Sequence, residues 1–350
     1  MKMTNLERVI KALKREEPDM VPTLELLHDK KVREAILPGG SYEDFIEHLD
    51  IDGMMVFDKV DAWKYESVDE SKGIRRDQWG AHVLFTKEAL GHPIQPALKS
   101  EKDLDSYIPP DPDEEWRYET LKKTIERFKG QRAVIAQATD VFDIARESLT
   151  GDVVYFESMI ENPDFVDRAN QIVLDYNLRY IKNCIELGAD VLCITGDFAM
   201  TKQPFVSPEF TARFLTPALK KQVELGHKLG VPVFKHTDGN LLPILDLLVE
   251  TGIDGLHPID PMAGMDLAYM KVNYGNKLCL IGNINCGPTL SWKSLDEVRQ
   301  EVKEAIKKAG FGGGYICASS NSIHSGVRPE NYVAMVKAVK EYGTYPLHLD

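Results

Sequence analysis

Short apolar runs alternate along this chain with longer segments in which apolar residues recur every three or four positions. The short runs are typical of strands buried on both faces, and the periodic segments are typical of helices that turn one face to a core. The segments with the strand pattern are 21–26, 53–58, 132–137, 191–195, 231–236, 255–257, 278–283 and 314–319. A helix or a long connection follows each of them. This count and order predict an α/β fold, a (β/α)₈ TIM barrel, in one domain over residues 1–350.

Capping signals mark the ends of the expected helices. Residues 4–7 and 294–297 match capping boxes, and 162–163 and 207–208 place a proline directly after a capping residue. The predicted helices are 5–14, 42–49, 115–128, 163–187, 208–229, 241–250, 295–308 and 329–341. The first of them precedes every strand, so the barrel is expected to carry an additional N-terminal helix.

The regular pattern is interrupted between about residues 59 and 113, where Trp, His, Gly and Pro are mixed with charged residues. This composition predicts a hairpin-bearing insertion, or lid, after the second strand. Within it, Trp79 and His82 fit a lid, and a hydrophobic anchor explains Trp79 equally well. A doubly wound open sheet is the competing architecture, but no glycine-rich dinucleotide turn follows any predicted strand.

Composition and charge narrow the classes of partner. Acidic residues outnumber basic ones 55 to 42, and the resulting net charge of −13 argues against nucleic acid or an anionic membrane as the main partner. No apolar run reaches the length of a membrane span, and the N-terminus does not read as a signal peptide. The five cysteines are scattered without a C-x-x-C motif, which indicates a reducing compartment. We therefore expect a cytoplasmic protein.

Polar side chains follow the predicted strands, at the barrel face where chemistry occurs in this architecture. They are Glu25, Asp58, Gln137, Asp197, His236 with Asp238, His257 with Asp260, Asn283 with Asn285, and Ser319 to Asn321 with His324. His236 and Asp238 are two positions apart and share a face on a regular strand. An imidazole and a carboxylate on one face can bind a divalent metal or act as an acid–base pair. They can equally form a hydrogen bond that only fixes a loop.

The other candidates have structural explanations as well. Asp197 could cap the loop that follows its strand. His257 could be a core histidine paired with the nearby Asp260, and His324 could be solvated. The sequence contains no G-x-S-x-G elbow, P-loop or H-E-x-x-H motif that would point to another chemistry.

A set of motifs occurs in one order along the chain: Thr195-Gly196-Asp197, 205–210, 236–240, 252–255 and 329–331. Together they resemble the uroporphyrinogen decarboxylase (URO-D) superfamily, which includes the cobalamin-dependent methyltransferases. The resemblance implies a (β/α)₈ barrel with an active-site cleft at the carboxyl ends of the strands. It also implies a monomer or a homodimer.

The resemblance to true decarboxylases is incomplete. Their arginine-rich M-R-Q-A-G-R segment corresponds here to residues 24–29, which contain no arginine. Their active-site tyrosine corresponds to Glu147 and the histidine of their C-terminal loop to Asn321, whereas Asp58 matches their aspartate after the second strand. Because a substrate with eight carboxylates needs positive charge, the resemblance does not favour decarboxylation of a porphyrinogen.

The zinc methyltransferases of the superfamily carry an H-x-C pair and a later cysteine. His236 matches the histidine, but the two cysteines correspond to Asp238 and Asn321. Soft sulfur ligands are therefore absent, which disfavours the usual methylation of a thiol. His236 and Asp238 would instead hold Zn²⁺ through nitrogen and oxygen, aided by Glu25, Glu147, Asp197 or His324. Such a site resembles the demethylating component of corrinoid systems.

We therefore expect a methyltransferase that moves a methyl group between a small O-methyl or N-methyl compound and a corrinoid on a partner protein. The expected catalytic residues are Asp197, His236 and Glu147, and the expected zinc ligands are His236 and Asp238. The residues expected to bind substrate are Glu25, Asp58, His257, Asn283, Ser319, Asn321 and His324. One alternative is a lyase acting on a carboxylated substrate of porphyrin metabolism. The other is a non-catalytic binding protein that retains the barrel and its pocket.

Overall fold

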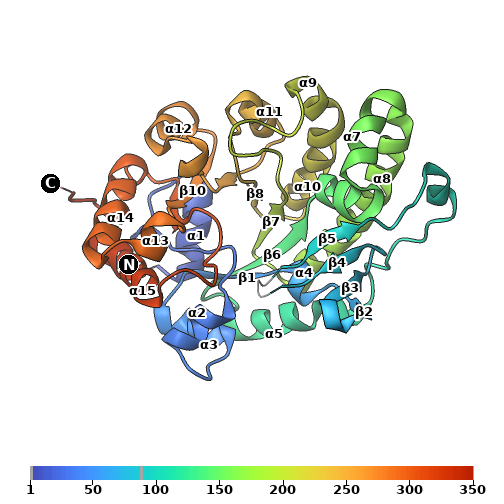
Figure 1. Ribbon diagram of the computed structural model, residues 1–350. Coiled ribbons are helices and arrows are strands. Elements are labelled where there is room, and N and C mark those ends of the chain that lie inside the picture. Colours follow the sequence, from blue (N-terminus) through green and yellow to red (C-terminus); the bar gives the residue numbers. More distant parts are fainter. Residues whose placement is uncertain (1–2, 87–89, 350) are drawn as a thin grey trace.

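Seven parallel strands form a curled sheet in the computed structural model, which describes residues 3–86 and 90–349 (Figure 1). In spatial order they are β1 (Gly53–Val56), β6 (Ala133–Thr139), β7 (Val191–Thr195), β8 (Val233–His236), β9 (Gly255–His257), β10 (Cys279–Ile284) and β11 (Tyr315–Ser319). Every residue of these strands except Asn283 is buried, as expected for parallel strands covered on both faces. The predicted strands of the barrel after 21–26 are therefore confirmed.

The first predicted strand, 21–26, has a less regular structure than expected. It contributes an isolated parallel bridge between Thr23 and Cys317 of β11, where the Cys317 amide donates to the Pro22 carbonyl at 2.9 Å. On its other side the Asp52 amide donates to the Thr23 carbonyl at 3.0 Å, just before β1. Pro22 has no amide hydrogen, so the segment cannot form a continuous ladder. It still joins β11 to the start of β1 and completes the TIM-barrel-like ring.

Helices surround this ring (Figure 1). They are α1 (Asn5–Leu13), α2 (Lys30–Ile36), α3 (Tyr42–Leu49), α4 (Asp58–Asp61), α5 (Glu119–Phe128), α6 (Val141–Asp143), α7 (Asp152–Glu161), α8 (Pro163–Leu187), α9 (Pro208–Phe210), α10 (Thr216–Lys228), α11 (Leu245–Glu250), α12 (Leu267–Tyr274), α13 (Pro288–Trp292), α14 (Leu295–Ala309) and α15 (Pro329–Tyr342). Capping boxes are present at Thr4 and Ser294, as the sequence predicted. Among the described residues, no helix combines the length and apolar character that crossing a membrane requires.

The N-terminal helix α1 packs against the apolar interior of the barrel. Its residues Val9, Ala12 and Leu13 pack in one buried cluster with inward-facing strand residues such as Ile135 and Phe234. Successive strand residues point to opposite faces, so their neighbours pack outward against the surrounding helices. Apolar strand residues fill the interior of the barrel, and α1 packs against them. The polar residues that follow the strands collect at the carboxyl ends.

The insertion after β1 forms a second, antiparallel sheet. Its strands are β2 (Tyr65–Asp69), β3 (Ile74–Asp77), β4 (His82–Leu84) and β5 (His92–Gln95), hydrogen-bonded in that order. Trp79, in the β3–β4 turn, is 1% exposed and contacts the rings of Trp63 and Tyr176 edge-on. The hairpin-bearing insertion is therefore confirmed, and Trp79 anchors it to the barrel helices.

Candidate metal centre and active-site cavity

A cavity of about 400 Å³ opens at the carboxyl ends of the strands. Its size lies in the range of about 300–1,000 Å³ that is usual for small-molecule sites. It is lined by Leu26, Phe57, Lys59, Leu90, Gly91, His92, Pro93, Asp143, Glu147, Thr195, Gly196, Asp197, His236, Asp238, Asn321 and Ser322. The wall thus combines barrel residues with β5 of the insertion.

Asp197, His236 and Asp238 come together in this cavity. One ligand atom from each lies within 4.8 Å of the other two. The turn that directs Asp197 depends on Gly196, whose φ of +152° is unfavourable for other residues. A Cβ on Gly196 would also lie 2.6 Å from Cβ of Asp140. Glycine at this position therefore lets the chain leave β7 sharply and bring the Asp197 carboxylate beside β8.

Hydrogen bonds fix the two carboxylates of this trio. The Asp238 amide donates to Asp197 Oδ1 at 2.9 Å, and Asn321 Nδ2 donates to Asp238 Oδ2. Asp238 Oδ1 is buried and has no hydrogen-bond partner among the described residues. A buried carboxylate oxygen without a partner is costly, so this oxygen is suited to a cation.

Burial and mutual repulsion make the carboxylates hard to ionise. Burial raises the pKa of Asp238 to about 8, and the negative charges of Asp197 and Asp260 act in the same direction. The pKa of Asp197 is also raised, by burial and then by Asp143. An opposite charge close to a carboxyl group favours its ionised form, so a cation among these groups would reverse both shifts.

His236 supplies the nitrogen of the trio. It is 7% exposed, and its Nδ1 lies 2.7 Å from Nδ1 of the buried His257. Burial, together with His257 and Lys235, lowers the pKa of His236 well below its usual value. The imidazole is therefore neutral at pH 7, which is the form that binds metals. Because Nδ1 is engaged, Nε2 is the nitrogen available to the cavity.

Glu147 also lines the cavity, in a π-helical segment, Ile144–Thr150. Such segments are rare and frequently occur at functional sites. Arg146 Nη2 donates to Glu147 Oε1 at 2.7 Å and to Asp143 Oδ1 at 3.2 Å, and Lys59 Nζ lies 3.9 Å from Glu147 Oε2. Burial, followed by repulsion from Asp143, raises the pKa of Glu147 to about 7. Glu147 can therefore gain or lose a proton near neutral pH.

Several residues that the sequence proposed for substrate binding lie behind this wall. Asp58 accepts hydrogen bonds from the amide and hydroxyl of Thr139, at 2.7 and 2.8 Å, and so joins the ends of β1 and β6. Glu25 Oε2 accepts from the Ser319 hydroxyl at 2.6 Å. Six of the substrate-binding candidates are not among the described residues that line the cavity: Glu25, Asp58, His257, Asn283, Ser319 and His324. Of the substrate-binding candidates, the cavity wall includes Asn321.

The cavity also contains residues that the sequence reasoning did not select. Lys59 and Asp143 each lie a few residues after a strand, so their distance from the strand end was a usable signal. His92 offered no signal, because it belongs to β5 in the aperiodic insertion.

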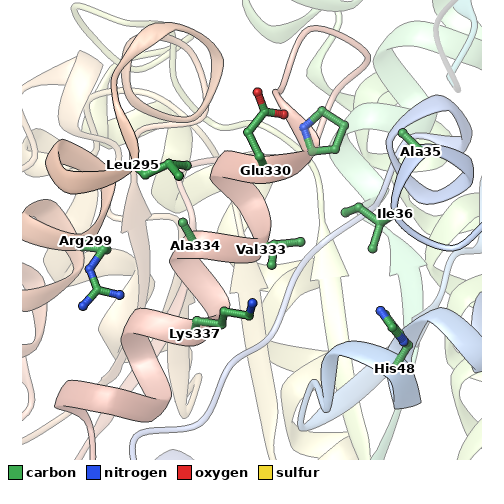
Figure 2. A pocket seen from close by; sticks show the side chains of 10 residues that line it. Ala35, Ile36, His48, Leu295, Arg299, Glu330, Val333, Ala334 and Lys337 are labelled. Carbon is green, nitrogen blue, oxygen red and sulfur yellow. The ribbon is translucent and has the colours of Figure 1, made fainter.

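A larger hollow of about 630 Å³ lies on the outside of the barrel (Figure 2). It runs between α2 and α3 on one side and α14 and α15 on the other. Figure 2 shows apolar side chains such as Val333 and Ala334 in the groove and the cationic Arg299 and Lys337 beside them. None of the trio lines it, and it lies away from the strand ends, so we assign the chemistry to the smaller cavity.

Comparisons with known proteins agree with the fold described above. Residues 76–342 match the family model described as uroporphyrinogen decarboxylase (URO-D). A uroporphyrinogen decarboxylase of Psychromonas ingrahamii is 25% identical over 276 residues, which cover 76% of this chain and 75% of the relative. The methylcobamide:CoM methyltransferase MtbA of Methanosarcina acetivorans is 26% identical over 224 residues, covering 64% and 62%. A solved structure of a methyltransferase from Methanosarcina mazei superposes with a TM-score of 0.76 at 19% identity, covering 97% of this chain and 99% of that one.

Proposed function

The chain belongs to the uroporphyrinogen decarboxylase (URO-D) family, and from this premise we propose that it is a methyltransferase. It moves a methyl group between a small O-methyl or N-methyl compound and a corrinoid carried by a partner protein. The observation that supports this most directly is the trio of Asp197, His236 and Asp238, whose ligand atoms lie within 4.8 Å of one another in the cavity. Similarity to a methylcobamide-dependent methyltransferase adds to it.

The charge of the cavity wall argues against a porphyrinogen as substrate. Four carboxylates line the cavity, from Asp143, Glu147, Asp197 and Asp238, and Lys59 is the only lysine or arginine among the described lining residues. A substrate with several carboxylates would find one basic side chain there to balance its charge and would therefore bind weakly. A small uncharged or cationic methyl donor fits this wall better.

The trio has the donor atoms that zinc prefers in catalytic sites, one imidazole nitrogen and carboxylate oxygens. The unpartnered Oδ1 of Asp238 and the raised pKa values of Asp197 and Asp238 indicate that these groups suit a bound cation. Asp197, His236 and Asp238 would hold the zinc. When bound, zinc would act as a Lewis acid toward the oxygen or nitrogen that bears the methyl group.

The residues of the chain have separate tasks in this proposal. Neutral His236 offers Nε2 to the cavity, and Asn321 orients the Asp238 carboxylate by its hydrogen bond to Oδ2. When the methyl group leaves an oxygen or an uncharged nitrogen, that atom needs a proton. Glu147, which lines the cavity, has a pKa near 7 and has its carboxylate held by Arg146, supplies this proton.

The experiment measures zinc content and methyl transfer together. Purified protein is assayed for zinc and then mixed with a Co(I) corrinoid and a panel of methoxyaromatic and N-methyl compounds, while the corrinoid spectrum reports methylation. We expect stoichiometric zinc and turnover of one class of donor, and loss of both in His236→Ala. The matched control is His227→Ala, because His227 is half-exposed and pairs with Asp254 away from the cavity.

The second candidate is a carboxy-lyase, since relatives such as the Psychromonas ingrahamii protein are named uroporphyrinogen decarboxylases. Release of CO₂ from a carboxylated porphyrinogen by metal-free protein would establish the lyase and overturn the transferase. A third outcome would point to a binding protein: corrinoid or methoxyaromatic compounds raise the thermal stability, but none of them is converted to a product. We also propose a cytoplasmic location, in keeping with the free cysteines of the described chain.

A further inference from the structure

Lys59 brings a positive charge to the wall of the active-site cavity. It lies in α4, which follows β1, and its side chain is 24% exposed. Its Nζ atom lies 3.9 Å from Glu147 Oε2, a distance that makes an ion pair but is too long for a hydrogen bond. No acceptor is in hydrogen-bond contact with Nζ in the part of the chain that the structure describes. The N–H groups of Lys59 are therefore available to a molecule in the cavity.

The ammonium group of Lys59 stays charged at neutral pH. Burial lowers its pKa, but the negative charges of Glu147, then of Asp143 and of two further carboxylates outweigh burial, so the pKa lies above its usual value. Nζ also lies 5.6 Å from the centroid of the Trp63 ring, within the range of a cation–π contact. These neighbours hold the charge at the wall without using its hydrogen-bond donors.

The remaining charges of the wall balance one another. Arg146 donates to Asp143 at 3.2 Å and to Glu147 at 2.7 Å. Arg146 and Lys59 together supply two positive charges for these two carboxylates. The other two carboxylates of the lining belong to the candidate cation site. Among the described lining residues, no carboxylate is therefore left for a cationic substrate, whereas Lys59 offers a charged hydrogen-bond donor to an oxygen atom.

Ether donors and ammonium donors leave different charges in the site. When a methyl group leaves an ether, the bond between oxygen and carbon breaks and its electron pair stays on the oxygen, which becomes negative. The carbon bonds to the electron pair of Co(I) in the corrinoid of the partner protein, and the cobalt is formally oxidised to Co(III). When a methyl group leaves an ammonium nitrogen, the electron pair only neutralises the nitrogen. A fixed cation therefore stabilises the reaction of the ether and repels the ammonium donor.

We propose that Lys59 binds the oxygen that loses the methyl group, so that the substrate is an uncharged O-methyl compound and not a methylammonium compound. The hydrogen bond from Lys59 strengthens as negative charge develops on that oxygen, and interactions of this kind raise kcat. Glu147, whose Oε2 lies 3.9 Å from Nζ, then gives the same oxygen its proton. The methyl acceptor in this inference rests on the proposed function, but the binding of an oxyanion by Lys59 does not.

The first test measures oxyanion binding without corrinoid or turnover. The probe is p-nitrophenol, the product expected from p-nitroanisole, because its phenolate absorbs visible light and its phenol form does not. A nearby cation favours the charged form of a bound acid. We therefore expect the bound probe to lose its proton at a pH about one unit lower on the unmodified protein than on Lys59→Met. Equal titration on both proteins, or no binding to the unmodified protein, would overturn the proposal.

The second test compares two classes of donor with a Co(I) corrinoid: methoxyaromatic compounds such as p-nitroanisole, and trimethylphenylammonium. We expect the unmodified protein to demethylate an ether and not the ammonium compound. Lys59→Met should lower kcat for the ether about 10–100-fold and change KM less, because a hydrogen bond to a charged group is lost as the charge develops. Lys59→Arg should keep most of the activity. An unchanged kcat in Lys59→Met, or faster demethylation of trimethylphenylammonium, would overturn the role of Lys59 and leave the transferase intact.

Lys64→Met is the matched control. Lys64 Nζ also lies near a tryptophan and a glutamate, 4.1 Å from the centroid of Trp116 and 3.5 Å from Glu114 Oε1, but Lys64 is not among the described lining residues. This control should keep the probe titration and the donor preference of the unmodified protein.

Thermal unfolding checks that each variant is folded, and Lys59→Gln replaces Lys59→Met if the latter is not. If neither class of donor is demethylated but the probe titrates as expected, the proposed function fails and oxyanion binding by Lys59 is supported. Demethylation of an ether with equal probe titration in all variants has the reverse meaning.

Discussion

Lys235 Nζ lies 3.0 Å from Asp140 Oδ2, and both side chains are completely buried. The same ammonium group donates to the Gly196 carbonyl at 2.8 Å and lies over the ring of Phe198, 4.3 Å from its centroid. This one cation therefore connects β8 to the segment after β6 and to the turn that directs Asp197. The pair thus fixes the turn that carries Asp197 of the candidate site.

Removal of one partner of this pair should be strongly destabilising. Lys235→Met leaves Asp140 buried without its cation, so we expect a loss of about 3–5 kcal/mol in the free energy of unfolding, measured with urea. Removing the exposed partner in Arg213→Ala, which breaks the surface pair with Asp167, should cost at most about 1 kcal/mol. A similar small loss in both variants would contradict this account.

Gly196 allows a test of the turn itself. Gly196→Ala introduces both an unfavourable φ of +152° and a contact of 2.6 Å with Asp140 Cβ. Gly312→Ala is the matched control, since Gly312 has a φ of +78° but open space around its Cβ position. We expect the control to lose about 1 kcal/mol in the free energy of unfolding and to keep its Zn²⁺ affinity. Gly196→Ala should lose more stability and at least about tenfold in affinity, as judged by thermal unfolding and chelator competition.

Glu25 gives the stability a defined dependence on pH. Burial raises its pKa from about 4.5 to about 8 in the folded chain, although hydrogen bonds from Ser319 oppose the shift. Between these values the folded state keeps a proton that the unfolded state has released. The contribution of Glu25 to the free energy of unfolding is therefore fully present below about pH 4.5. It falls as the pH rises from about 4.5 to about 8, by up to about 1.4 kcal/mol per pH unit.

Glu25→Gln should remove the part of this dependence that Glu25 causes, because the amide keeps the shape but does not ionise. Guanidinium unfolding at pH 5 and pH 8 measures the difference for both proteins. The control is Glu209→Gln, which changes an exposed carboxyl. An unchanged pH dependence in Glu25→Gln would show that Glu25 does not cause it.

The spatial position of Asn321 permits a change of ligand type. Asn321 Nδ2 donates to Asp238 Oδ2, so cysteines at these two positions would lie beside each other and beside His236. We expect the double variant Asp238→Cys, Asn321→Cys to prefer Cd²⁺ over Zn²⁺ relative to the unmodified protein, because thiolates are softer ligands. With Co²⁺ it should show the near-ultraviolet bands of sulfur coordination, which the unmodified protein should lack. The single variant Asp238→Cys should give weaker bands.

Much of the barrel could be predicted because its strands are buried on both faces and so read as unbroken apolar runs. Segment 21–26 has the same apolar character, yet it forms only an isolated bridge, because Pro22 lacks the amide hydrogen that a regular ladder needs. The apolar pattern predicts burial but does not reveal this missing hydrogen bond. The strands β2–β5 were not individually predictable. They are three to five residues long, and β3 has the charged Arg75 and Arg76 side by side, both exposed, so it lacks the alternation that marks a strand.

The direction of each polar side chain was not accessible from sequence. Asp58 and Asp197 both follow barrel strands, yet Asp58 bonds to Thr139 inside the protein and Asp197 faces the cavity. The difference comes from Gly196, whose positive φ turns the chain, and that dihedral angle is a property of the folded turn. His257 is similar: its sequence neighbours suggested an acid partner, but its partner is His236.

The insertion sheet touches the cavity through β5, while Trp79 and the hydrogen bond from Ser148 to Asp77 attach it to the barrel helices. The β5 part of the cavity wall and the candidate trio of Asp197, His236 and Asp238 are thus encoded by different stretches of the gene. Evolution or engineering can therefore exchange residues in β2–β5 to change which molecule binds, while Asp197, His236 and Asp238 at the ends of β7 and β8 are kept unchanged.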